Sequence, residues 1–167
     1  PISDLWSMQN GYALATRRGL DMISSHLRDV GEGVSSELAG RLRIGVHQGV
    51  EVTDGTSSLG PLVTQVFCSA LPVAYGRWPQ ALWQNFAQLV LDSAYEATLL
   101  AGVLNSRQGG SNIVLLTLLG GGAFGNAPEW IHSAIARALA KSHVYGLDVR
   151  LVSYGQPSAQ LQKLVQD

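Results

Sequence analysis

Short apolar runs and longer amphipathic stretches alternate along most of the chain. Three apolar runs bounded by turn-forming residues predict strands, at 62–73, 113–120 and 147–154. Three stretches with apolar residues three or four positions apart predict helices, at 83–104, 129–142 and 158–165. This β-α-β-α-β-α order predicts an α/β fold, a three-layer α/β/α sandwich around a mixed, mostly parallel sheet.

The first third of the chain has a less regular pattern. Residues 1–40 are predicted to be mostly helical, because apolar residues recur there at helical spacing. Alternation over 42–53 predicts two short strands that turn at Gln48-Gly49. Neither an internal repeat nor a composition break is found, so residues 1–167 are expected to form a single domain.

A glycine-rich loop is the most distinctive segment. It follows the run 113–120, in which seven of eight residues are apolar, as in a strand buried on both faces. Four glycines fall between Gly120 and Gly125, and Pro128 then opens the next predicted helix. Glycines let backbone N–H groups approach a ligand closely, and the first amides of a helix have no partner within it. This segment therefore predicts a site for a ligand that carries phosphate.

The glycine loop matches neither common phosphate fingerprint. No Lys-Ser or Lys-Thr pair follows the glycines, and their spacing is not GxGxxG. A tight turn between strand and helix, which needs glycine only for a positive φ, is therefore an alternative explanation.

Composition narrows the class of protein. A hydrophobic fraction of 46% with 14% charged residues is typical of a folded globular domain. The net charge of −1 argues against a broad basic surface for nucleic acid, and leaves only a local groove open to it. No apolar stretch reaches the roughly 18 residues of a membrane helix, and the first residues do not form a signal peptide. No membrane partner is expected.

The single cysteine and the histidines suggest no metal site. Cys68 lies in an apolar run and has no partner for an internal disulfide, which indicates a packing role in a reduced, cytoplasmic protein. The four histidines are scattered, at positions His26, His47, His132 and His143. Because no cluster has metal-ligand spacing, neither a metal nor another cofactor is expected.

Three segments resemble the C-terminal half of a macrodomain: Leu91–Glu96, Ile113–Gly125 and Leu147–Tyr154. Macrodomains are α/β modules that bind ADP-ribose, and some of them hydrolyse ADP-ribose linkages. The resemblance therefore implies a macrodomain-like fold with ADP-ribose or an ADP-ribosylated protein as its partner. In that family, a loop with a small-x-Gly-x-Phe/Tyr-Gly pattern wraps the diphosphate with its amides. The matching residues here are Gly120, Gly121, Gly122, Ala123, Phe124 and Gly125, and Asn126, which follows them, is also expected to contact the ligand.

The resemblance assigns roles to two aromatic residues. Phe124 would lean on the distal ribose, and Tyr154, at the end of the last predicted strand, would lie beside the adenine. The alternatives are a Phe124 side chain folded back on the core and a Tyr154 side chain in the core or at its rim.

The N-terminal half departs from the macrodomain pattern. Asn10, in Met8-Gln-Asn-Gly11, would match the asparagine that contacts the distal ribose. Asp21, in Gly19-Leu-Asp, would match the aspartate that helps to activate water in hydrolytic members. A carboxylate that complements a helix dipole is the alternative for Asp21. The family's triple glycine is replaced by Thr16-Arg-Arg-Gly19, and its adenine-recognising aspartate has no clear counterpart.

Three functions follow from these residues. The first is binding of ADP-ribose or a related nucleotide diphosphate through the glycine loop. The second is ADP-ribosyl hydrolysis, with Asp21 as the catalytic carboxylate. The third is a macrodomain-like scaffold without ligand binding that acts through protein contacts, which the bulky Arg17-Arg18 pair favours.

Overall fold

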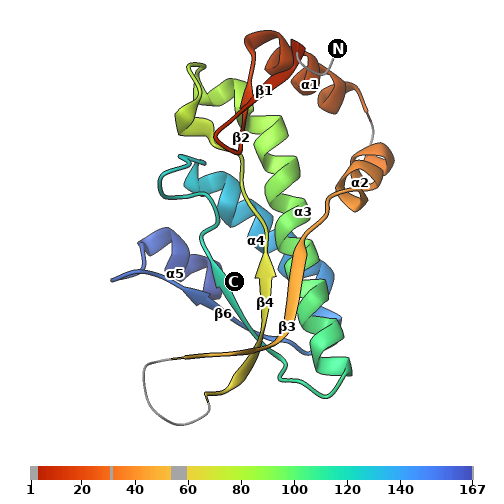
Figure 1. Cartoon of the computed structure of the whole chain (residues 1–167), viewed down its shortest axis with the longest axis vertical. Coiled ribbons are helices and arrows are strands. Elements are labelled where there is room, and N and C mark those ends of the chain that lie inside the picture. Colours follow the sequence, from red (N-terminus) through yellow and green to blue (C-terminus); the bar gives the residue numbers. More distant parts are fainter. Residues whose placement is uncertain (1–3, 31, 54–59, 167) are drawn as a thin grey trace.

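The computed structural model describes residues 4–30, 32–53 and 60–166. It is a mixed α/β structure in which helices alternate with small sheets (Figure 1). Within the described ranges, no helix is both long enough and apolar enough to cross a membrane.

A long helix, α3 (Gln80–Arg107), forms the axis of the fold (Figure 1). Helix α4 (Pro128–Ser142) packs along it. The buried residues of α3 recur at helical spacing and include Trp83, Ala87, Leu91, Ala94 and Leu99. Their counterparts on α4 include Ile131, Ala134, Ile135 and Ala138. Because alanines alternate with large side chains on both helices, the two surfaces interlock to form the core.

Two parallel strands lie beside this helix pair. They are β5 (Ile113–Thr117) and β6 (Asp148–Val152), which pair from Ile113 opposite Asp148 to Thr117 opposite Val152. Val114 and Leu116 of β5 are buried against the helices, whereas Leu115 is 63% exposed. The prediction that this strand is buried on both faces is therefore wrong, because the described residues cover only one face.

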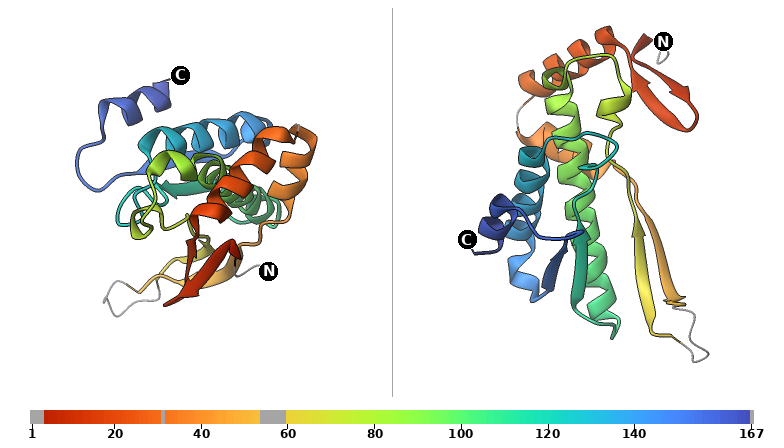
Figure 2. Two further views of the ribbon diagram at one scale, coloured as in Figure 1. Left: turned by 90° about the horizontal axis from the view of Figure 1, so that it is seen from above. Right: turned by 90° about the vertical axis from the view of Figure 1, so that its left-hand side faces the viewer.

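The other strands form two antiparallel pairs. One pairs β1 (Trp6–Gln9) with β2 (Tyr12–Ala15), and the other pairs β3 (Gly45–Glu51) with β4 (Leu62–Phe67). The β3–β4 ribbon diverges from β5, as the right-hand view of Figure 2 shows. The mixed α/β class is confirmed, but the described strands form three two-stranded sheets rather than one mostly parallel sheet.

The N-terminal region differs from its predicted helix. Asn10 and Gly11, with φ of 51° and 83°, form the two-residue turn of the β1–β2 hairpin. Asn-Gly is favoured in such turns because both central residues need positive φ. The helices follow the hairpin, as α1 (Arg17–Asp29) and α2 (Glu32–Gly40). Thr16 caps α1 by accepting a hydrogen bond from the Gly19 N–H at 2.9 Å.

The predicted turn at Gln48-Gly49 is a bulge within one continuous strand. The pairing of β3 with β4 shifts register between His47 and Val50, and Gly49 has a φ of 66°. A positive-φ glycine suits a bulge as well as a turn, which explains the wrong prediction. The predicted strand 62–73 ends at Phe67, and a short 3-10 turn, η2 (Val73–Tyr75), follows.

The C-terminal elements agree with the predicted order. Helix α4 continues into η3 (His143–Tyr145), and Gly146 ends this segment in the left-handed conformation, with a φ of 65°. After β6, the chain ends in helix α5 (Ala159–Gln166), whose Leu161 is buried.

Candidate phosphate-binding site

The glycine loop lies at the carboxyl ends of β5 and β6 and leads into α4 (Figure 1). Because the two strands are parallel, both end at this edge, which is where α/β proteins commonly bind ligands. A cavity of about 480 Å³ opens here. It is lined by residues of the loop, α4 and the segment after β6, including Gly121, Gly122, Pro128, His132, Ser153 and Tyr154.

The amides of the loop fall into two groups. Three of them stabilise the loop, with Gly121, Gly125 and Asn126 donating to the carbonyls of Leu118, Gly122 and Gly120 at 3.1, 3.0 and 3.0 Å. The N–H groups of Gly120 and of residues 122–124 have no hydrogen-bond partner among the described residues. The predicted seven-residue cradle therefore includes three consecutive free donors, at residues 122–124, and of these three residues only Gly122 lines the cavity.

Two glycines of the loop are required by the fold. Gly120 has a φ of 77°, and a β-carbon placed there would lie 2.4 Å from the Ala70 β-carbon. Gly125 has a φ of 67°, and its β-carbon would lie 2.7 Å from that of Ala74. The tight-turn explanation accounts for these two positions, because both the conformation and the space exclude a side chain.

Gly122 is different. Its φ is not positive, and a β-carbon placed on it would meet no atom within 4 Å. Neither backbone conformation nor packing therefore requires glycine at this position. A ligand that approaches the backbone closely would require it.

The start of α4 adds partial positive charge rather than further donors, because Pro128 has no N–H and the Trp130 and Ile131 N–H groups donate to the Ala127 C=O. Ala127 occupies the N-cap position without a side-chain cap, and Pro128 is the first helical residue. Because no side chain caps this 15-residue helix, the partial positive charge of its N-terminus faces the glycine loop. Glu129 in the first turn complements the same dipole from the exposed side.

Asn126 stabilises the loop through hydrogen bonds of its side chain. Its side chain is 3% exposed, and its Nδ2 donates to the carbonyls of Leu71 at 2.9 Å and Gly120 at 3.2 Å. Its Oδ1 is buried without a partner among the described residues. This residue was predicted to contact the ligand, and the structure places its side chain behind the loop.

Phe124 belongs to an aromatic cluster, which consists of Phe124, Tyr12 and Tyr75. Its ring is edge-to-face with that of Tyr12 at 5.7 Å and with that of Tyr75 at 5.5 Å. Phe124 packs against the core and is not among the residues lining the cavity. The arrangement corresponds to the folded-back alternative rather than to a ring that faces the ligand.

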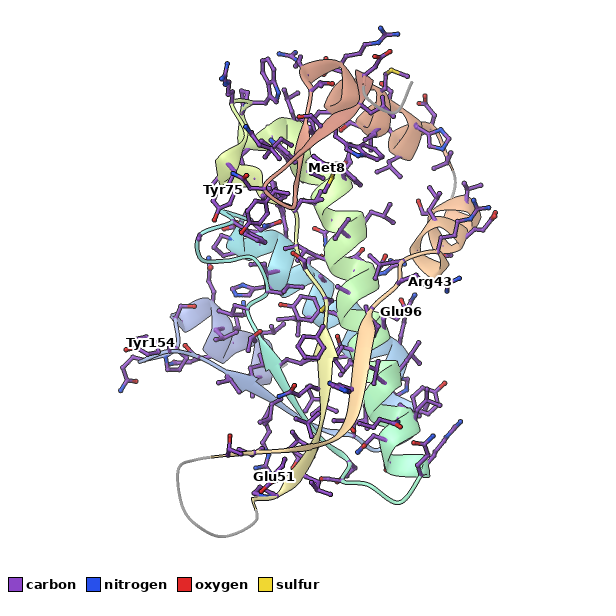
Figure 3. The ribbon with its side chains drawn as sticks, in the orientation of Figure 1. Met8, Arg43, Glu51, Tyr75, Glu96 and Tyr154 are labelled. Carbon is purple, nitrogen blue, oxygen red and sulfur yellow. The ribbon has the colours of Figure 1, made fainter. Side chains whose placement is uncertain are left out.

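Tyr154 lines the cavity and is fully exposed. It follows β6, and Figure 3 shows it well away from Tyr75. Neither a core nor a rim position describes this ring, and its free face is open to a ligand.

His132 and Ser153 line the same cavity but were not among the predicted site residues. His132 lies four positions after Pro128, so both residues are on one face of α4. The position of His132 one helical turn after Pro128 is a sequence signal that predicts a residue of this site. It was missed because the histidines were considered only as possible metal ligands.

Asn10 and Asp21 do not line the cavity. Asn10 is exposed in the hairpin turn described above. Asp21 lies in the second turn of α1 and pairs with Arg17 at 2.9 Å, with 49% of its side chain exposed. Because the first turn of α1 contains no acidic residue, Asp21 does not cap the helix dipole either.

Cys68 lies outside this site. Its thiol is half-buried, 3.9 Å from Thr98 Oγ1, and burial raises the pKa of the thiol. A raised pKa keeps it protonated at neutral pH, which suits a packing residue rather than a nucleophile. Among the described residues, no group of three potential His, Cys, Asp or Glu ligands could hold a metal ion.

Comparisons with known proteins complete the description of the site. No protein-family model, curated protein or solved structure matches this chain.

Proposed function

We propose that this protein binds a nucleotide diphosphate, with ADP-ribose as the best candidate, at the cavity beside the glycine loop. The free N–H of Gly122 at the cavity wall, with those of Ala123 and Phe124 next to it in the loop, supplies donors for a diphosphate, and the uncapped start of α4 supplies partial positive charge. The cavity of about 480 Å³ falls within the range of roughly 300–1,000 Å³ for small-molecule sites.

Gly122 is the main observation that supports the proposal. It is a glycine that the fold does not require, at the wall of the cavity, with a free amide. A phosphate oxygen held by that amide would leave no room for a side chain, which gives a physical reason for glycine at this position.

The rest of the nucleotide would contact side chains at the cavity wall. Tyr154 offers an exposed aromatic face for the base, and Ser153 and His132 offer hydrogen-bonding groups for ribose or phosphate. ADP-ribose is preferred among nucleotide diphosphates because of the resemblance to macrodomains. That resemblance to macrodomains is part of this proposal.

The proposal is limited to binding. No carboxylate is among the described residues that line the cavity, and Asp21 is paired with Arg17 on α1. Hydrolysis would need a group that positions or activates water near the ligand, and Asp21 is not placed to do this.

Calorimetric titration with ADP-ribose, ADP and AMP tests the proposal. ADP-ribose and ADP should bind, and AMP should bind about tenfold more weakly, because it lacks the second phosphate. If ADP-ribose and ADP produce no heat at millimolar concentration, the proposed site does not exist and the scaffold hypothesis gains support.

The variant Gly122→Glu tests the role of the loop. Glutamate fits the open space at this position but places a carboxylate beside the free amides, so affinity should fall by about a hundredfold or more. Gly40→Glu is the matched control, because Gly40 also has open space and lies in α2, outside the cavity. Equal affinity of both variants for ADP-ribose would place the site elsewhere.

A further inference from the structure

A second cleft lies between two strand edges. Strand β5 pairs with β6 along one edge, and β4 pairs with β3 along one edge. Between β4 and β5 is a cleft of about 900 Å³, with α3 as its third wall. The right-hand view of Figure 2 shows β4 and β5 as separate strands that diverge from one another.

The free edge of β5 presents unpaired main-chain groups. The Asp148 N–H donates to the Asn112 C=O at 3.0 Å, which sets the register of the parallel ladder. Because alternate residues of a strand direct their main-chain groups to opposite edges, Val114 and Leu116 bond to β6. Ile113, Leu115 and Thr117 direct theirs into the cleft.

The ends of this edge are capped, but its middle is not. The Ile113 N–H donates to Ser111 Oγ at 3.1 Å, and the Thr117 C=O accepts a hydrogen bond from the Tyr95 hydroxyl at 2.8 Å. Among the described residues, the Leu115 N–H and C=O have no partner. An edge of this kind is a template for an added strand.

The walls of the cleft define the chemistry of its occupant. None of the described residues that line it is charged. Leu62, Ile113 and Leu115 leave large apolar side chains exposed there, at 70%, 43% and 63%. Ala101 and Gly102 of α3 also line the cleft, and Gly102 lets β5 pack closely on the helix, since a β-carbon there would lie 2.5 Å from Val114 Cγ2. An uncharged, apolar, extended segment fits these walls, whereas a charged one would lose hydration without gaining a partner.

The occupant must also have two free edges of its own. A strand held between β4 and β5 would bond to both of them, and each described strand already has a partner along one edge. A second copy of the chain would have to break one of its own strand pairs to supply such a segment. A single extended segment of another polypeptide would not.

We propose that the β4–β5 cleft binds an uncharged, apolar, extended segment of a partner protein as an added strand. The added strand would join β3–β4 and β5–β6 into one sheet, and its main-chain bonds would make recognition tolerant of sequence. This inference does not depend on the nucleotide site, which lies at the strand ends rather than along the strand edge.

A fluorescent peptide tests this inference. Its core is alternating valine and threonine, about seven residues long to span β5, with lysines at both ends for solubility. Fluorescence anisotropy should show saturable binding to the whole chain. The same peptide with N-methylvaline at its centre keeps its side chains but loses a main-chain donor, and it should bind about tenfold more weakly.

Two matched variants locate the bound peptide. Leu115→Lys places a charge in the uncharged cleft at an exposed position and should weaken binding about tenfold or more. Val144→Lys makes a similar change at a 69% exposed position outside the cleft and should leave binding within about twofold. Both variants should remain folded, because neither position is buried.

Amide exchange gives an independent readout. Bound peptide should slow exchange at Leu115 and Thr117, whose amides face the cleft, and leave Val114 and Leu116, already bonded to β6, little changed. The proposal is overturned if the peptide does not bind at about millimolar concentration, or if both lysine variants lose affinity equally. It is also overturned if ultracentrifugation shows a dimer that Leu115→Lys dissociates, because the occupant would then be a second copy.

Discussion

The helix pair and the strand pairs of this protein differ in how much of their apolar surface and main chain is buried or bonded. Along α3 and α4, side chains such as Leu91 and Ile135 have no exposed surface. Along β4 and β5, Leu62 and Leu115 remain more than half exposed, and each strand has only one neighbour among the described residues. An isolated two-stranded ribbon is marginally stable in water, so the helix pair must supply most of the stability.

This difference suggests that the helix pair provides stability and that the ends and edges of the strands provide the proposed binding sites. The helix pair holds β5 through Val114 and Leu116 and fixes the position of the glycine loop at the end of that strand. The unpaired main-chain groups are found at the strand ends and strand edges, where the loop amides and the β5 edge lie. Both proposed binding sites use groups that the core has positioned but not bonded.

The largest effect on stability is expected from removing a side chain between the helices. Leu91→Ala leaves a cavity in the fully buried core and should lower the free energy of unfolding by about 2–5 kcal/mol. Leu100→Ala on the same helix, at 45% exposure, should cost less than about 1 kcal/mol. Urea unfolding of both variants measures the difference. Similar losses would mean that the helix pair is not the main source of stability.

A smaller effect is expected where the core meets the glycine loop. The Tyr95 hydroxyl donates to the Thr117 C=O and accepts from the Leu119 N–H, both at 2.8 Å. Tyr95→Phe removes both bonds and should lower the free energy of unfolding by about 1–2 kcal/mol at pH 7. Affinity for ADP-ribose should change little, since Tyr95 does not line the nucleotide cavity.

The same variant has a pH signature. Burial raises the pKa of Tyr95 to about 12, above its ordinary value of 10.0, so the folded state keeps the proton longer than the unfolded state. The stability of the wild type should therefore fall, relative to Tyr95→Phe, by roughly 2–3 kcal/mol as pH rises from 10 to 12. Parallel pH curves for the two proteins would contradict the buried, bonded position of this hydroxyl.

The smallest effect on stability is expected from Asp92, at the edge of the helix pair. Burial raises the pKa of Asp92, although a hydrogen bond from Gln88 at 2.7 Å and the charge of Arg137 at 3.7 Å oppose the shift. A raised carboxyl pKa means that stability falls as pH rises above the ordinary value of 3.8. Asp92→Asn avoids that loss, so it should be slightly more stable than the wild type at pH 7 and equal to it at pH 3. If Asp92→Asn is clearly less stable than the wild type at pH 7, the ion pair with Arg137 stabilises the protein by more than burial of the carboxylate destabilises it.

The elements predicted well from sequence are those fixed by local pattern. Helices α3 and α4 have long periodic apolar faces, and β5 is a continuous apolar run followed by glycines. The position of the glycine loop between strand and helix follows from the same local signals. Asn10-Gly11 was also a local signal for a hairpin, but it was interpreted through the macrodomain resemblance instead.

The features missed from sequence depend on residues far apart in the chain. The turn predicted at Gly49 is a bulge because β3 continues to pair with β4 beyond it. Phe124 faces Tyr12 and Tyr75 rather than the cavity, and those partners come from a hairpin and a turn much earlier in the chain. The division of the loop amides into bonded and free groups likewise depends on folded geometry, which residue spacing does not specify.

The central claim is that the amides of residues 122–124 hold a diphosphate. A two-dimensional ¹H–¹⁵N titration of the wild-type chain with ADP-ribose tests it most directly. The free amides of Gly122, Ala123 and Phe124 should show the largest shifts, and those of Gly121, Gly125 and Asn126, already bonded to loop carbonyls, should shift less. Saturable binding of ADP-ribose that leaves these three amides unmoved would contradict the claim, as would the absence of any binding.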